Sequence, residues 1–270
     1  MVGFIREVCE TSEAKNVVVD LSKVQEMTPD AVAVLLAMIQ HCRIVGARMS
    51  GNAPENPKAR EMLNNSGFRS HVASAPGFAG VPSKGRIGKF AKSRETSADR
   101  YSQSLALELI RFATLQLTGI EQHHGPSYSV FGEAMLNTLN HAAKLGEPKE
   151  PWWASVYYDQ ERKRACFTFL DQGVGIFRSH TLTANLKFQT LVGMLDQAQI
   201  LEKIFNGEIP SSTRIPGRGN GIPEMYESCK AGRIRNLTVI ANKACGEAEP
   251  DRYTVLSEPF EGTLLYWEIA

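Results

Sequence analysis

The stretch Cys166-Phe-Thr-Phe-Leu-Asp-Gln-Gly-Val-Gly175 joins a strand to a turn and sets the fold class of the C-terminal part of this chain. Its apolar and β-branched beginning predicts a buried strand, which ends at Asp171. Gly173 and Gly175 let the following backbone turn tightly and approach a ligand closely. A strand-ending turn without any ligand would produce the same pattern, so its meaning depends on the segments around it.

Upstream, Glu133-Ala-Met-Leu-Asn137 predicts a helix with chemical groups on one side. The helical period places Glu133, Asn137 and His141 on one polar stripe. The apolar residues of the opposite side are Phe131, Met135, Leu139 and Ala142. The stripe is compatible with a solvated surface helix. It is also compatible with a pocket wall, where a carboxylate activates water or a hydroxyl and an amide oxygen binds Mg²⁺.

Downstream, a second glycine segment, Gly217-Arg-Gly-Asn-Gly221, precedes an expected helix at 222–231. Backbone N–H groups at a helix N-terminus bind phosphate, and Gly217, Gly219 and Gly221 keep them accessible. Arg218 adds a charged donor to this segment, which also contains Asn220. The sequence contains no G-x-x-x-x-G-K-[ST] segment, which excludes a P-loop, and the late position of these glycines disfavours a Rossmann site.

The remaining patterns predict a chain of two α/β parts. Strands and helices alternate at 17–21, 28–46, 47–50 and 58–65, with Thr28 as the helix N-cap and Pro29 in the first turn. A glycine-, proline- and lysine-rich stretch then predicts a linker. The expected boundaries are 1–75 for the first domain, 76–99 for the linker and 100–270 for the second domain. Further expected helices are 102–117, 127–143 and 191–205, and further expected strands are 152–158, 164–170, 236–241 and 262–269.

The composition favours a cytoplasmic protein with neither a nucleic-acid nor a membrane partner. Thirty basic and 29 acidic side chains nearly cancel, so no global field attracts a polyanion. The longest apolar run, 31–39, is far shorter than the roughly 20 residues of a membrane span. Five cysteines without a C-x-x-C pair fit a reducing compartment. The pair His123–His124, with no carboxylate at ligand spacing, is not expected to bind a metal.

Residues from about 100 to 269 resemble the Bergerat-fold (GHKL, histidine-kinase-like) ATPases. Glu133-x-x-x-Asn137 resembles the N box, Asp171-x-Gly-x-Gly175 the first glycine box and 217–221 the second, with 176–216 similar to the ATP lid. Thr263 resembles the threonine on the last strand of the family. The resemblance implies ATP and Mg²⁺ as cofactors. The implied nucleotide-binding residues are Asn137, His141, Asp171, Gly173, Gly175, Ile176, Gly217, Arg218, Gly219, Asn220, Gly221 and Thr263.

Within this family, Asn137 would coordinate Mg²⁺, Asp171 would bind adenine and Glu133 would be the catalytic base. The variant with His141 after Asn137 is most similar to the anti-sigma-factor serine kinases. Residues 17–68 resemble a STAS domain, the fold of the protein partners of those kinases, although Thr28-Pro29-Asp30 replaces the usual phosphorylated serine motif. The implied fold is a small STAS-like α/β domain followed by an α/β sandwich with a mixed sheet and helices on one face.

Three functions remain open at this point. In the first, Mg²⁺-ATP switches contacts with a regulatory protein, such as a STAS-type or sigma-factor-related partner. In the second, the chain is an ATPase or a protein serine/threonine kinase that uses Glu133. In the third, it is a non-catalytic interaction scaffold. The sequence leaves open the partner's identity, the modification of Thr28 and whether the chain forms a homodimer.

Overall fold

A computed structural model gives the structure of the chain. The described residues are 4, 7–8, 10–11, 16–66, 68, 87–89, 93–98, 100–141, 152–177, 194–209 and 221–270. The elements, in chain order, are β1 (Asn16–Val19), α2 (Pro29–Ile44), β2 (Arg48–Gly51), α3 (Pro57–Asn65), β3 (Ile87–Lys89), β4 (Ser93–Ala98), α5 (Gln103–Thr118), α6 (Gly125–His141), β5 (Trp152–Asp159), β6 (Arg164–Asp171), α9 (Gln197–Phe205), α10 (Gly221–Lys230), β7 (Arg235–Glu247) and β8 (Arg252–Ile269).

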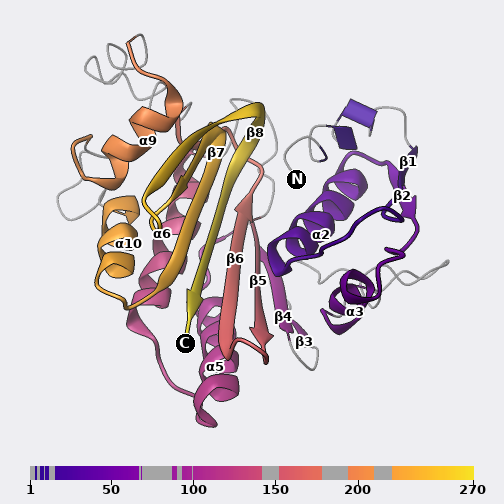
Figure 1. Ribbon diagram of the computed structural model, residues 1–270, viewed down its shortest axis with the longest axis horizontal. Helices are drawn as coiled ribbons and strands as arrows, with labels where there is room; N and C mark the ends of the chain where they lie inside the picture. Colours follow the sequence, from indigo (N-terminus) through magenta and orange to yellow (C-terminus); the bar gives the residue numbers. More distant parts are fainter. Residues whose placement is uncertain are drawn as a thin grey trace.

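Two sheets organise these elements (Figure 1). In the N-terminal part, β1 and β2 pair in parallel. In the C-terminal part, the described strands form a six-stranded sheet in the order β3-β4-β5-β6-β8-β7. Every pairing described in that sheet is antiparallel, so the expected mixed sheet is wrong, whereas the broad class of strands packed against helices is confirmed.

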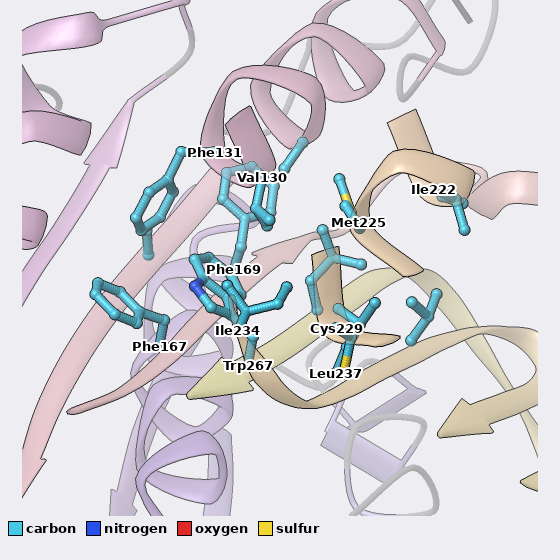
Figure 2. Packing of buried hydrophobic residues seen from close by; sticks show 14 of the residues in the cluster. Val130, Phe131, Phe167, Phe169, Ile222, Met225, Cys229, Ile234, Leu237 and Trp267 are labelled. Atoms are coloured by element: carbon cyan, nitrogen blue, oxygen red, sulfur yellow. The ribbon is translucent and has the colours of Figure 1, made fainter. Parts of the chain in front are cut away.

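One face of the large sheet packs against α5, α6, α9 and α10 (Figure 1). Strand alternation places Phe167 and Phe169 of β6 and Trp267 of β8 on this face. The rings of Phe167 and Trp267 stack with centroids 5.1 Å apart, and Phe131 of α6 meets both rings edge-on. Figure 2 shows α6 and α10 converging on this aromatic layer, which fixes both helices against the sheet.

The opposite face of the sheet packs against α2 (Figure 1). Every residue from Val32 to Ile39 is buried, so α2 is apolar on all sides and needs cover all round. One side of α2 contacts the small N-terminal sheet. The other side shares a hydrophobic cluster with four sheet residues, which are Trp153, Leu170, Phe260 and Leu264. The helices described in the C-terminal part thus lie on one face of the large sheet, whereas α2 of the N-terminal part covers the other face and belongs to the cores of both parts.

Most of the expected elements are present, with differences at the sheet edges. The order strand, helix, strand, helix in the N-terminal part is confirmed. Within the expected linker, however, 87–89 and 93–98 form β3 and β4 at one edge of the sheet, so the linker prediction is wrong for these residues. Ser93–Ala98 has a polar sequence, and its pairing with β5 decides its conformation. At the other edge, β7 is longer than expected, and so is β8 beside it.

The first helix of the N-terminal part begins where expected. Thr28 is the N-cap of α2 and Pro29 lies in its first turn. The predicted N-cap position of Thr28 is therefore confirmed, and its side chain makes no capping hydrogen bond. Among the helices described, none is long and apolar enough to cross a membrane.

Candidate functional site

Asp171 is the buried polar centre of the candidate site. It ends β6, it is only 6% exposed, and it lies in register with Thr263 of β8. The Gly173 N–H donates to its Oδ1 at 2.9 Å, and hydrogen bonds from Thr263 and from Thr138 of α6 also favour the carboxylate. Burial outweighs these donors and raises the pKa of Asp171 to about 6. The fold thus joins β6, β8 and α6 at one carboxylate.

Two glycines allow the backbone to close around Asp171. Gly262 has φ +117, and a side chain there would collide with the Asp171 carbonyl group. Gly175 has φ +75, which non-glycine residues rarely adopt. A Cβ on Gly175 would lie 2.5 Å from the side-chain oxygen of Asn242. Glycine at position 175 therefore allows a close approach to Asn242, which is not among the predicted site residues, and the expected close approach to a ligand stays a prediction.

Asn242 of β7, which is separated from β6 by β8, holds the glycine turn. It is 6% exposed, its Nδ2 donates to the Val174 carbonyl at 3.1 Å, and its Oδ1 accepts from the Phe177 N–H at 3.2 Å. It lies at an irregular point of β7, with φ 49. Asparagine tolerates the left-handed backbone of a bulge, but Asn242 follows the expected strand 236–241, so no local pattern marked it as a site residue.

Helix α6 presents different groups to different neighbours. Its apolar side is confirmed, because Phe131 and Met135 are buried. Thr138 is buried and contributes to the site of Asp171. Asn137 is exposed, whereas Glu133 is half-buried. Of the polar stripe predicted from periodicity, Asn137 is therefore exposed to solvent, and Glu133 is packed against neighbouring residues.

Glu133 faces the beginning of α10. A Cβ on Gly221 would lie 2.7 Å from Glu133 Oε2, so the last residue of the second glycine segment touches the candidate base. A groove of about 430 Å³ runs between α6 and α10. Its lining residues include Ser129, Glu133, Gly221, Glu224 and Arg233. The structure thus brings the segments 133–137 and 217–221 together, at Glu133 and Gly221.

Some predicted residues lie outside the described part of the chain. These residues are Gly217, Arg218, Gly219 and Asn220, together with most of the expected lid. His141 closes α6, but its side chain is not among those described. Ile176 lies half-buried in the turn after Gly175. The predicted roles of these residues stay predictions.

The site is also connected to the opposite face of the sheet. Leu170, next to Asp171, packs into the hydrophobic cluster of α2. The Gln172 side chain donates to the Ala37 carbonyl of α2 at 3.4 Å. Leu170 and Gln172 therefore face the N-terminal part, and Asp171 between them faces the candidate site. Helix α2 is thus a direct neighbour of the site.

The histidine pair has a structural role at one member. The Ser127 N–H donates to His124 Nδ1 at 3.2 Å, so that nitrogen is an acceptor and Nε2 carries the proton. The Trp267 indole donates to Ser127 Oγ at 3.1 Å, which ties this turn to the sheet. Burial lowers the pKa of His124. In the described part of the chain, no group of three or more His, Cys, Asp or Glu side chains is placed to hold a metal ion.

No protein-family model matches this chain, and no curated protein matches it.

Proposed function

We propose that the chain is a cytoplasmic, ATP-binding regulatory protein in which Mg²⁺-ATP bound beside Asp171 controls protein–protein contacts. The observation that carries this proposal is the buried Asp171 carboxylate at the end of β6, beneath a glycine turn and beside Thr263. It agrees with the resemblance of residues 100–269 to the Bergerat-fold ATPases.

The chemistry of Asp171 fits an adenine base. Its pKa of about 6 leaves the carboxylate mostly ionised at pH 7. A buried carboxylate accepts strongly from an exocyclic amine, because water does not compete in the low local dielectric. The donors that already surround Asp171 hold it in one orientation, so it is ready to accept a further hydrogen bond from a base.

The phosphate end fits the beginning of α10. Gly221 starts that helix, and the N–H groups of a first helical turn attract phosphate oxygens. Arg218 and the preceding glycines would add donors there, and the exposed Asn137 amide would hold Mg²⁺. When bound, ATP would supply a transferable phosphoryl group with its metal ion. These residues of the chain would bind and orient it.

The regulatory element of the proposal is supported by the contact with α2. Leu170 and Gln172 connect the residues beside Asp171 to this helix. A ligand that changes the turn would therefore have a direct contact through which to change the packing of the N-terminal part. Such coupling is reciprocal, so the packing of α2 would also change the affinity for the ligand.

A second candidate function, ATP turnover or phosphoryl transfer to a serine or threonine, is favoured by Glu133. This carboxylate is half-buried beside Gly221, at the expected phosphate end. A carboxylate there can take the proton of water or of a hydroxyl group. A pure binding protein would not need this group.

Isothermal titration with Mg²⁺-ATP tests the proposal. We expect the wild type to bind Mg²⁺-ATP and Asp171→Asn to bind it about tenfold or more weakly. In that variant an amide N–H group replaces a carboxylate oxygen, so a donor would face the donors that the oxygen accepted from. Asp159→Asn is the matched control, since Asp159 lies at the far end of the β5–β6 hairpin. Absence of binding by the wild type at millimolar ATP contradicts the proposal. ATP binding that is unaffected by Asp171→Asn would favour the interaction scaffold, with ATP bound in a pocket away from Asp171.

A further inference from the structure

The side chain of Asn242 makes two hydrogen bonds to the same turn. Its amide group donates to Val174 and its carbonyl oxygen accepts from Phe177, so it spans the turn as a clamp. Both partners are backbone groups in a segment that forms no strand pairing of its own. A side chain from β7 therefore supplies two of the hydrogen bonds that hold this turn.

The backbone of Asn242 is adapted to this position. Its φ of 49 lies in the left-handed region, where glycine and asparagine are tolerated best. The register of β7 against β8 shifts on both sides of it. A bulge of this kind re-aims a side chain, and here the side chain points at Gly175. The local conformation of β7 and the clamp are therefore parts of one arrangement.

The clamp holds the turn that carries Asp171, whose carboxylate would bind the base. The turn begins with Asp171 and Gly173, whose N–H donates to that carboxylate. Because the turn is fixed before a ligand binds, the ligand does not have to order it, and the Asp171 carboxylate is held in one geometry. A turn held in this way would discriminate among bases better than a loose one.

We propose that Asn242 is a positioning residue, which holds the turn 171–177 in the shape that binds adenine in preference to guanine. This inference rests on the proposed function, because it concerns the same nucleotide site. Asn242 itself would touch neither base nor phosphate. It acts through Val174, Phe177 and the position of Asp171.

The experiment measures ATP and GTP affinities of the wild type, Asn242→Gly and Asn242→Asp by titration, with melting temperatures of all three. Asn242→Gly keeps the left-handed backbone and removes both hydrogen bonds. Asn242→Asp keeps the acceptor for Phe177 and loses the donor to Val174. Asn236→Gly is the matched control, because Asn236 also lies on β7 with φ 50 and also uses its side-chain amide, to Glu268.

We expect Asn242→Gly to weaken ATP binding about tenfold, as the loss of two hydrogen bonds predicts, and to lower the ratio of GTP to ATP dissociation constants. Asn236→Gly should lower the melting temperature and leave that ratio unchanged, which separates positioning from stability. An unchanged ratio in whichever Asn242 variant folds overturns the inference and leaves ATP binding intact. Absence of ATP binding by the wild type overturns the proposed function, and this inference with it.

Discussion

The substitution Gly175→Ala tests whether the glycine turn is constrained by its neighbour in β7. Two costs add at this position. The backbone has φ +75, which costs an alanine about 1–2 kcal/mol. The new Cβ would also lie within 2.8 Å of three atoms of the Asn242 side chain, so that side chain must move. Moving it breaks the bonds to Val174 and Phe177, at about 0.5–1.5 kcal/mol each.

The expected loss for Gly175→Ala is therefore about 2–5 kcal/mol of unfolding free energy. Gly207→Ala is the matched control, because Gly207 has φ +71 and no other atom lies within 4 Å of the place that an alanine Cβ would take. It should lose only the backbone cost of about 1–2 kcal/mol. Urea unfolding of the two variants measures the difference, which we expect to be about 1–3 kcal/mol.

A double variant makes the test sharper. With Asn242→Gly in place, the obstacle is gone, so adding Gly175→Ala should cost no more than the control does at Gly207. The coupling between the two sites would then be measured directly. If Gly175→Ala and Gly207→Ala unfold within about 0.5 kcal/mol of each other, the contact with Asn242 does not constrain the turn.

Burial and charge give three further predictions. Leu36→Ala in α2 should lower the unfolding free energy by about 2–5 kcal/mol, in a single calorimetric transition, because Leu36 is fully buried in the cluster shared with the sheet; two separate transitions would show that the parts fold independently. Burial raises the pKa of Asp171 from 3.8 to about 6, so the folded state binds this proton more tightly than the unfolded state. The corresponding stability of about 3 kcal/mol is present below pH 4 and is lost as the pH rises through 6. Urea unfolding between pH 4 and 7 should therefore differ between the wild type and Asp171→Asn, and parallel curves would refute this pKa. Finally, Glu133→Gln should bind ATP as the wild type does and lose any ATP turnover, and equal turnover in the two proteins would remove Glu133 from the chemistry.

Periodicity predicted the helices well because it records the environment of each helix along its own length. The amphipathic pattern around Glu133 placed Phe131 and Met135 in the core, and both are buried. The same reasoning failed for β3 and β4. Their residues are polar and carry no strong strand signal, so pairing with β5 decides their conformation.

The candidate site was only partly visible in the sequence. Asp171 and Gly175 were identifiable, because an aspartate at the end of a strand and paired glycines are local signals. Thr138 and Asn242 were not, because each contributes through contacts with residues far away in the chain. No local pattern distinguishes a buried threonine that supports a carboxylate from one that only fills space.

Local sequence was sufficient to predict the strand that ends in Asp171, the glycines that follow it and the two-sided helix of Glu133, because these depend on neighbouring residues and on local backbone freedom. Long-range packing, in contrast, placed α2 on the second face of the sheet, Asn242 against the turn and Gly221 against Glu133. These features arise from contacts between distant segments. Burial of an apolar surface favours such packing and does not specify in advance which segment will provide it.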